Sequence, residues 1–472
     1  MTREGLGLVG GAAADRPVVS TLVLAFGLTA LAVIGGDDAM GASAIRQPLI
    51  DILVSAGAIV GAPLLLCALA PGRRVARMGL AFAIAALAAA AILIQPARWL
   101  AAPAAMAASI VASGALAVVL VTAVPAFGAL SRLAFVPLAA ALLGSAAASG
   151  FFAIQGQAES PAFGASAGLA LALGSAIGCA TLSDFTREFT QGADRRTAAG
   201  RAAQDGVGLV VFSVIISAAA FGLLSGEAAG GHLVVAGLAG AAALLTTVSA
   251  LVVSGAALSL RRSSEVLAVE ENLRRQSFRE YWRPIRRALS PAAANAAVAV
   301  AAIAVMAIAL NMTAPISIAL VLFIVVAGAL AGLVLFSLRA GLFVFFSMLV
   351  AVVAVKWIWR EVGAPEPTMA DEAAALAFTA VLYGQLALCW REARSPRLNP
   401  RETTEAAMTE AFRLYVVSAL VGMTAFFALS AAHVWPLGAI AAAEAGVLLT
   451  IGLVLGPALM TALSNAVRRE LA

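Results

Sequence analysis

Apolar runs long enough to cross a lipid bilayer follow one another along almost the whole of this chain. A run of about twenty residues spans the hydrocarbon core as a helix, and about fourteen such runs can be counted. Hydrophobic residues make up 62% of the sequence and charged residues 12%, so a water-soluble core cannot bury the apolar surface. The sequence therefore predicts an all-α, polytopic membrane protein. The runs lie near residues 18–36, 49–70, 78–95, 104–127, 132–154, 164–184, 206–225, 232–259, 292–310, 315–336, 339–358, 371–390, 412–430 and 436–463.

The positive charges predict how these spans are oriented. If the N-terminus lies in the cytoplasm, every Lys and Arg falls on the cytoplasmic side except Arg46, Arg98, Lys356 and Arg360. Moving one span would invert all later loops and destroy this asymmetry, so the positive-inside rule favours an even number of spans with both termini cytoplasmic. We therefore expect a multi-pass protein of a bacterial-type inner membrane. Because the basic residues lie in short connections, its partner is the lipid bilayer, and nucleic acid is not expected.

The second half of the chain repeats the first. Residues 213–226 (SVIISAAAFGLLSG) align with 418–431 (SALVGMTAFFALSA), and the preceding polar segments 196–205 and 401–410 align at the same offset. An Arg-Glu pair precedes both polar segments. Internal repeats in an apolar chain are typical of transporters. The repeat directs the functional question toward transport.

This repeat divides the chain into four predicted parts. We expect a two-helix membrane hairpin at 1–76 and two six-helix repeats at 77–260 and 291–472. Between the repeats, residues 261–290 form the only long polar segment. Its apolar residues recur at near-helical spacing among Arg and Glu, which favours an amphipathic helix on the cytoplasmic membrane surface; a solvated linker is the alternative.

Motifs near the end of the second half carry a family resemblance. A helix that ends in Phe-x-x-Leu-Ser at 426–430 is followed by a last helix with Gly438, Gly446 and Pro457. These features resemble the last two helices of a half in the resistance-nodulation-division (RND) superfamily, particularly its MMPL and sterol-sensing-like branch. The Arg-Glu pair at 391–392 is similar to the one that ends the fourth helix of such halves. The resemblance implies a membrane core of two six-helix halves.

Two departures from that family pattern bear on function. Family members carry large extracytoplasmic domains after the first helix of each half, whereas the connections here are only 95–103 and 311–314. The family's fourth helices commonly carry an acidic residue for proton coupling, whereas the corresponding positions lie near Ile177 and Val381. The chain thus resembles a membrane core reduced to helices, and no proton-relay carboxylate is carried over from the family.

Glu444 is the main candidate for a substrate or ion path, because an ionisable group inside an apolar run is costly. It lies in AIAAAEAGVLL, about two turns into the last helix from the outer face. Our hypothesis is that Glu444 titrates, or binds a cation or a polar substrate group, in an internal cavity. The alternative is a carboxylate close enough to the interface to meet water or His433.

Three further polar residues are path candidates. Tyr383 and Gln385 form a polar pair in the middle of a run, where they line a path or make hydrogen bonds between helices. Asp184 lies three residues before Arg187, at the cytoplasmic end of its run, where an interfacial ion pair is the alternative to a relay.

Motifs of catalysis are not found. The chain contains no HExxH, no GxxxxGK[ST] and no Ser/His/Asp set in a soluble domain, and its three cysteines (Cys67, Cys179 and Cys389) lie in apolar runs without metal-ligand spacing. We expect neither an enzyme nor a bound metal or cofactor.

Three functions remain open from the sequence. The first is an inner-membrane transporter that exports or translocates a lipid or another hydrophobic substrate. The second is a fourteen-helix, proton-coupled drug or solute transporter of the major facilitator type, because residues 70–79 (APGRRVARMG) resemble that superfamily's basic loop. The third is a non-transporting scaffold or assembly subunit that binds a membrane or periplasmic partner protein.

Overall fold

The computed structural model describes seven stretches of the chain and a few isolated positions before residue 149. Within these residues the secondary structure is entirely α-helical. The predicted hairpin at 1–76, the first helices of 77–260 and the surface helix at 261–290 lie outside the described residues, so the predicted count of fourteen spans and the repeat architecture stay predictions. The described stretches are 162–224, 231–259, 291–311, 317–362, 367–393, 399–431 and 438–470.

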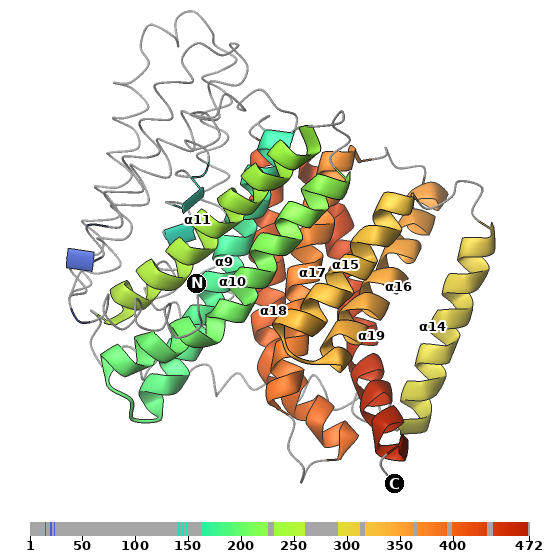
Figure 1. Ribbon diagram of the computed structural model, residues 1–472. Coiled ribbons are helices and arrows are strands. Elements are labelled where there is room, and N and C mark those ends of the chain that lie inside the picture. Colours follow the sequence, from blue (N-terminus) through green and yellow to red (C-terminus); the bar gives the residue numbers. More distant parts are fainter. Residues whose placement is uncertain are drawn as a thin grey trace, which may run out of the picture. The chain divides into compact units, whose positions relative to one another are not determined.

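Nine helices cover the described stretches (Figure 1). Six of them, namely α9, α10, α11, α16, α17 and α19, are long and apolar enough to cross a membrane. The nine are α9 (Ala162–Thr190), α10 (Arg195–Leu224), α11 (Gly231–Ser259), α14 (Pro291–Asn311), α15 (Ile318–Val334), α16 (Leu338–Val362), α17 (Met369–Glu392), α18 (Pro400–Ala431) and α19 (Gly438–Glu470).

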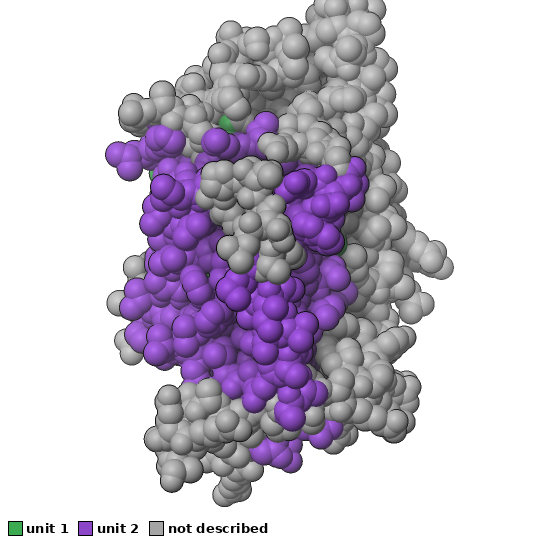
Figure 2. Space-filling view, turned by 90° about the vertical axis from the view of Figure 1, so that its right-hand side faces the viewer, with its two compact units in different colours: residues 1–214, 237–276, 420–439 green, residues 215–236, 277–419, 440–472 purple. Residues whose placement is uncertain are grey.

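The chain forms two compact units, which Figure 2 distinguishes by colour. Unit 1 comprises residues 1–214, 237–276 and 420–439. Unit 2 comprises residues 215–236, 277–419 and 440–472.

The core of unit 1 joins α9, α10 and α11. Ile177 of α9, Val210 of α10 and Leu251 of α11 belong to one buried cluster. Polar side chains of the buried helix α9 are satisfied within the helix, since the Ser175 hydroxyl donates to the carbonyl of Leu171 at 2.8 Å. This local bonding lets a hydroxyl lie in an apolar interior without an unpaired group.

In unit 2, α15 and α16 cross at very close range. A Cβ atom at Gly341 would lie 2.6 Å from the carbonyl oxygen of Gly328, so only glycine fits there. The turn between the two helices contains Phe336 with a φ of 48°, in the left-handed region. From α17, Arg391 Nη1 donates to the carbonyl oxygen of Leu335 at 2.7 Å. The glycines and this hydrogen bond together fix the turn against the end of α17.

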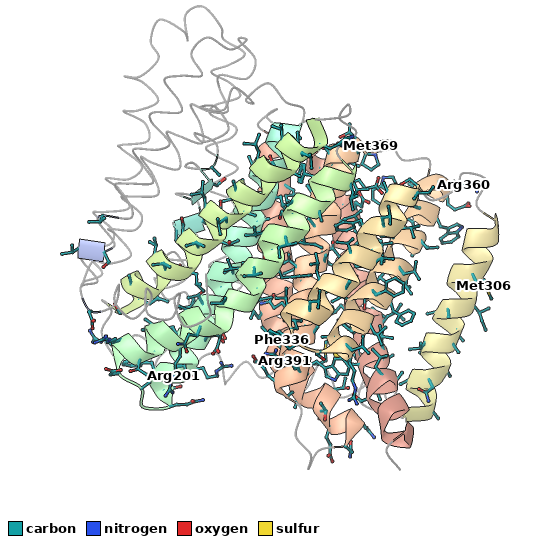
Figure 3. The ribbon with its side chains drawn as sticks, viewed as in Figure 1. Arg201, Met306, Phe336, Arg360, Met369 and Arg391 are labelled. Carbon is teal, nitrogen blue, oxygen red and sulfur yellow. The ribbon has the colours of Figure 1, made fainter. Side chains whose placement is uncertain are left out.

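Labelled residues in Figure 3 mark the two opposite ends of the helices of unit 2. Figure 3 shows Phe336 and Arg391 at one end and Arg360 and Met369 at the other. The second end is where α16 finishes and α17 begins. There Thr368 caps α17 in a capping box, which satisfies free N–H groups of its first turn.

Candidate functional site

Charged side chains from three helices come together where α16 ends and α17 begins. Lys356 Nζ of α16 lies 2.7 Å from Glu372 Oε1 of α17. Glu444 of α19 interacts electrostatically with Lys356, Glu372 and Asp371. We call these four residues, Lys356, Asp371, Glu372 and Glu444, the charged cluster.

Local structure explains the position of two of these carboxylates. The Asp371 side chain accepts hydrogen bonds from the backbone N–H of Thr368, at 3.0 Å, and from the Thr368 hydroxyl. Asp371 therefore belongs to the cap that starts α17. Glu372 is the next residue along and pairs with Lys356. The capping box thus fixes the helix start that presents Glu372 to α16.

Glu444 lacks such an arrangement. The residue is only 2% exposed, and no hydrogen-bond partner for its Oε2 is found among the described residues. An ionised carboxylate in an apolar interior costs several kcal/mol unless it is paired and hydrogen-bonded. The one lysine that acts on Glu444, Lys356, is already paired with Glu372, and two further carboxylates, Asp371 and Glu372, act on Glu444 with the opposite sign. The arrangement is therefore suited to holding a proton or a small cation at Glu444.

Just after Glu444 along α19, two tyrosines hydrogen-bond to the helix backbone. The Tyr383 hydroxyl donates to the carbonyl oxygen of Leu448, and the Tyr415 hydroxyl donates to that of Leu449 at 2.8 Å. Glu444 and Leu448 are four residues apart and so lie on one face of the helix. A Cβ atom at Gly452 would come within 2.0 Å of the Tyr383 ring, so the absence of a side chain there permits this contact. Glu444 thus lies on a face of α19 that is packed tightly against α17.

The other sequence candidates occupy different environments. Tyr383 makes the hydrogen bond between helices just described. Gln385 is 4% exposed, and its Oε1 has no partner within the described stretches. Asp184 belongs to unit 1 and forms an ion pair with Arg187 at 3.4 Å. His433, the alternative partner of Glu444, lies outside the described residues.

Sequence reasoning overlooked three members of the site, and Asp371 was one of them. Lys356 was interpreted only as a charge that sets topology, and Glu372 was not singled out. A signal was present, because Lys356 closes one apolar run and Glu372 opens the next. Charges at the end of one span and the start of the next must lie on the same side of a membrane.

The positions that correspond to the RND relay acids are apolar in the structure as well. Ile177 and Val381 are each 2% exposed, and Ile177 packs in the core of unit 1. Glu444 lies on a different helix from both, so the charged cluster is not a shifted copy of that relay.

Comparisons with known proteins give a fold but no close relative. No protein-family model matches the chain, and no curated protein is similar in sequence. Two solved structures of SecDF are similar in fold. The structure of SecDF from Thermus thermophilus, a translocon-associated membrane protein, has a TM-score of 0.54 at 16% identity, covering 77% of this chain and 62% of that one. SecDF in its super-membrane-facing form has a TM-score of 0.53 at 15% identity, covering 77% and 63%.

These likenesses show an RND-like fold, since SecDF is a member of that superfamily. They do not favour the MMPL or sterol-sensing branch. The chain spans less than two thirds of the length of either SecDF structure. With six apolar helices long enough to span a membrane in its described part, the chain is a multi-pass membrane protein with a SecDF-like fold.

Proposed function

We propose that this chain is an inner-membrane transporter in which Glu444 takes up and releases a proton while a hydrophobic or lipid substrate moves across or out of the membrane. The observation that carries the proposal is the buried Glu444 carboxylate, which has an oxygen without a hydrogen-bond partner in the described part of the chain and lies beside the Lys356–Glu372 ion pair. Intramembrane ionisable groups are usually retained for transport of ions or substrates.

Protonation of Glu444 changes the forces between three helices. With a proton on Glu444, Lys356 needs to neutralise only Glu372, which ties α16 to α17. Without that proton, Lys356 faces ionised carboxylates on both α17 and α19, and its attraction is divided between them. A change in one protonation state therefore shifts the balance of packing among α16, α17 and α19. Such a shift is what a proton gradient needs in order to drive a conformational change.

The sequence supports a substrate that is soluble in the bilayer. The two connections that carry large domains in RND proteins are short here, at residues 95–103 and 311–314. A substrate has no large outer domain to receive it at these places, so it must enter the helical core directly. Lipids and other hydrophobic molecules reach such a core from within the membrane. This reasoning supports a lipid or another hydrophobic substrate, which is the first of the three functions that the sequence leaves open.

One observation favours a second function, that of an assembly subunit without transport. SecDF, whose fold is similar, is described as translocon-associated. A helical core that binds a partner membrane protein would use the same fold without needing a relay acid in the fourth helix.

A proteoliposome experiment tests the first proposal. Purified protein is reconstituted, a proton gradient is imposed, and internal pH is followed with and without a panel of phospholipids and amphiphilic drugs. The wild type is compared with Glu444→Gln and with Glu392→Gln, a matched change at a carboxylate that is 41% exposed. We expect substrate-dependent proton flux in the wild type and in Glu392→Gln, and loss of that flux in Glu444→Gln.

Two results would contradict the proposal. Equal flux in Glu444→Gln would remove Glu444 as the proton carrier. No flux in any monodisperse, folded sample would favour the assembly subunit, and a search for co-purifying membrane proteins would follow.

A further inference from the structure

Unit 2 contains an apolar cavity between α14, α16 and α19. Its volume is about 470 Å³, which lies within the usual range for small-molecule sites. Asn295 and Ser347 are the polar residues in its lining, and the remainder of the lining is apolar. Its lining contains no residue of the charged cluster and neither tyrosine, although α19 contributes to all three features and α16 to the cavity and the charged cluster.

Small residues explain why this space is empty of side chains. Ala301 and Ala302 of α14 and Gly452 and Ala462 of α19 line the cavity. At one end the helices close together, because Ala294 of α14 and Ala458 of α19 share a buried cluster. Beyond that contact the small side chains leave the helices separated by a hollow.

The cavity is open to the surroundings of unit 2. Its lining residues Met306 and Phe346 are 60% and 40% exposed. Helix α14 stands at the edge of unit 2 (Figure 1), and its Val300 and Ile303 side chains are 65% and 63% exposed. Figure 2 views unit 2 from this side. In a membrane these exposed apolar side chains face lipid, so the hollow behind α14 is reached from the bilayer.

The shape of the cavity selects among hydrophobic ligands. Its lining extends from Asn295 to Met306 along α14 and from Ile451 to Leu463 along α19. Eleven or twelve residues of helix correspond to about 16 to 18 Å. A space of about 470 Å³ drawn out over this length is long and narrow. An unbranched hydrocarbon chain fits such a space better than a compact polycyclic molecule does.

Ser347 adds a polar requirement. The residue is 3% exposed, and its hydroxyl has no hydrogen-bond partner within the described residues. Many buried hydroxyls bond to the carbonyl four residues earlier in their own helix, as Thr379 does to Ala375 at 2.8 Å. Of the buried hydroxyls that have no partner among the described residues, Ser347 is the one that lines the cavity. A buried hydroxyl without a partner is costly, and an oxygen atom of a ligand in the cavity would satisfy it. The ligand class is therefore an alkyl chain that carries an ester or carboxyl oxygen.

We propose that this cavity binds one ester-linked acyl chain of a membrane phospholipid, which is the substrate of the transporter. This inference rests on the proposed function, because it names the substrate class of the same transporter. Helices α16 and α19 carry both the cavity wall and the Lys356–Glu444 interaction, so the proposed lipid site and the proposed proton site share two helices.

Photo-crosslinking in a defined bilayer tests the inference. The purified full chain is reconstituted in vesicles of phosphatidylethanolamine and phosphatidylglycerol containing a trace of phosphatidylglycerol with a diazirine in its acyl chain. After illumination, lipid adducts are located by peptide mass spectrometry. We expect adducts on the cavity side of α14 and α16 to exceed those at Val321 and Leu322, which are comparably exposed apolar residues on α15, and to fall when unlabelled phosphatidylglycerol is added. Equal labelling of all three helices, without competition, would mean bulk lipid only and would overturn the inference.

A matched pair of variants sharpens the result. Ala302→Phe fills the cavity, whereas Ala304→Phe places the same ring on an exposed part of the same helix outside the lining. Most cavity adducts should be lost in Ala302→Phe and kept in Ala304→Phe. If Ala302→Phe does not give a monodisperse protein, the smaller Ala302→Met replaces it. Labelling that is unchanged in the filled variant would overturn the proposal.

The two proposals fail in different ways. Glu444→Gln should keep the cavity adducts, because the carboxylate is not part of the lining. Cavity labelling without any proton flux would leave a lipid site in a protein that does not transport, and thereby contradict the proposed function while supporting the site. Substrate-dependent flux without cavity labelling would support the transporter and overturn the lipid site.

Discussion

Units 1 and 2 treat their charged side chains in opposite ways. In unit 1, where α9 ends and α10 begins, three carboxylates each have an arginine partner, and Arg187 serves two of them. Arg201 lies 2.8 Å from Glu188, and Arg187 lies 3.4 Å from Asp184 and 3.6 Å from Asp205. Glu188 is buried, and the other four side chains are partly exposed. Such pairs close the ends of helices at an interface and contribute modestly to stability.

In unit 2, Glu444 departs from this pattern. It is almost fully buried, its Oε2 has no hydrogen-bond partner among the described residues, and the lysine that acts on it, Lys356, is paired with Glu372. The comparison separates two uses of charge near a membrane. Ion-paired carboxylates mark where helices leave the bilayer, whereas a buried carboxylate without a dedicated partner needs a proton or a cation to neutralise it.

The largest effect on stability is expected from removing the lysine of the charged cluster. Lys356→Met leaves Glu372 and Glu444 without a cation, and breaking a buried pair in this way is strongly destabilising. Because the Lys356 side chain is 31% exposed, we discount for solvent screening and expect the free energy of unfolding to fall by about 2 kcal/mol. Denaturant titration of the purified protein in detergent measures this quantity.

The matched change in unit 1 is Arg187→Met, for which we expect a loss of at most about 1 kcal/mol. Adding Glu372→Gln to Lys356→Met should recover part of the stability, because one unpaired carboxylate is removed. Equal losses in the free energy of unfolding for Lys356→Met and Arg187→Met would contradict the distinction between the two units.

A smaller effect is expected where α17 packs on the Glu444-bearing face of α19. Gly452→Ala drives a methyl group into the Tyr383 ring, which must move and give up its hydrogen bond to Leu448. We expect the free energy of unfolding to fall by about 1 to 2 kcal/mol, as for other overpacked cores. Gly456→Ala is the control, since its added carbon would meet Phe343 at 3.6 Å, an ordinary contact.

If the charged cluster depends on this packing, Gly452→Ala also lowers proton flux in proteoliposomes and Gly456→Ala does not. Flux and stability that are unaffected in both variants would show that α19 moves freely past Tyr383.

The fold was predictable where hydropathy alone determines a helix. The predicted span at 371–390 matches α17 (Met369–Glu392) closely, because both of its ends coincide with charged residues. By contrast, α10 begins at Arg195 although the apolar run begins near 206. Its polar first turns are rich in Ala and Arg, which are good helix formers, so the helix extends beyond the apolar run. Helix α18, which begins at Pro400, differs from its predicted span for the same reason.

The site was predictable only in part. Glu444 could be singled out because one acid in a long apolar run is conspicuous. Its neighbours Lys356 and Glu372 could not be paired with it, because that depends on the rotation of three helices about their axes. The cavity was not predictable either, since it arises from small residues on α14 and α19 that are common throughout the chain.

The smallest expected effect concerns an exposed charge in unit 1. Asp194 precedes α10, and its side chain accepts a hydrogen bond from the backbone N–H of Thr197 at 2.9 Å. Hydrogen bonding by Thr197, with a smaller contribution from Arg196, lowers the pKa of Asp194 below its ordinary value. Because the folded chain holds this proton less tightly than the unfolded chain does, the cap stabilises fully above the ordinary pKa of aspartate, about 3.9. The stabilisation is lost as pH falls through the folded pKa.

Asp194→Asn keeps a capping side chain but cannot titrate. We expect the variant to match the wild type in thermal stability at neutral pH and to lose slightly less stability on acidification, which parallel melting curves over a pH series would measure. A large loss of thermal stability at neutral pH would mean that the Asp194 charge contributes about as much to stability as the Lys356 charge does. The contrast between solvated charges in unit 1 and buried charges in unit 2 would then have to be abandoned, because exposure would no longer determine how much a charge contributes.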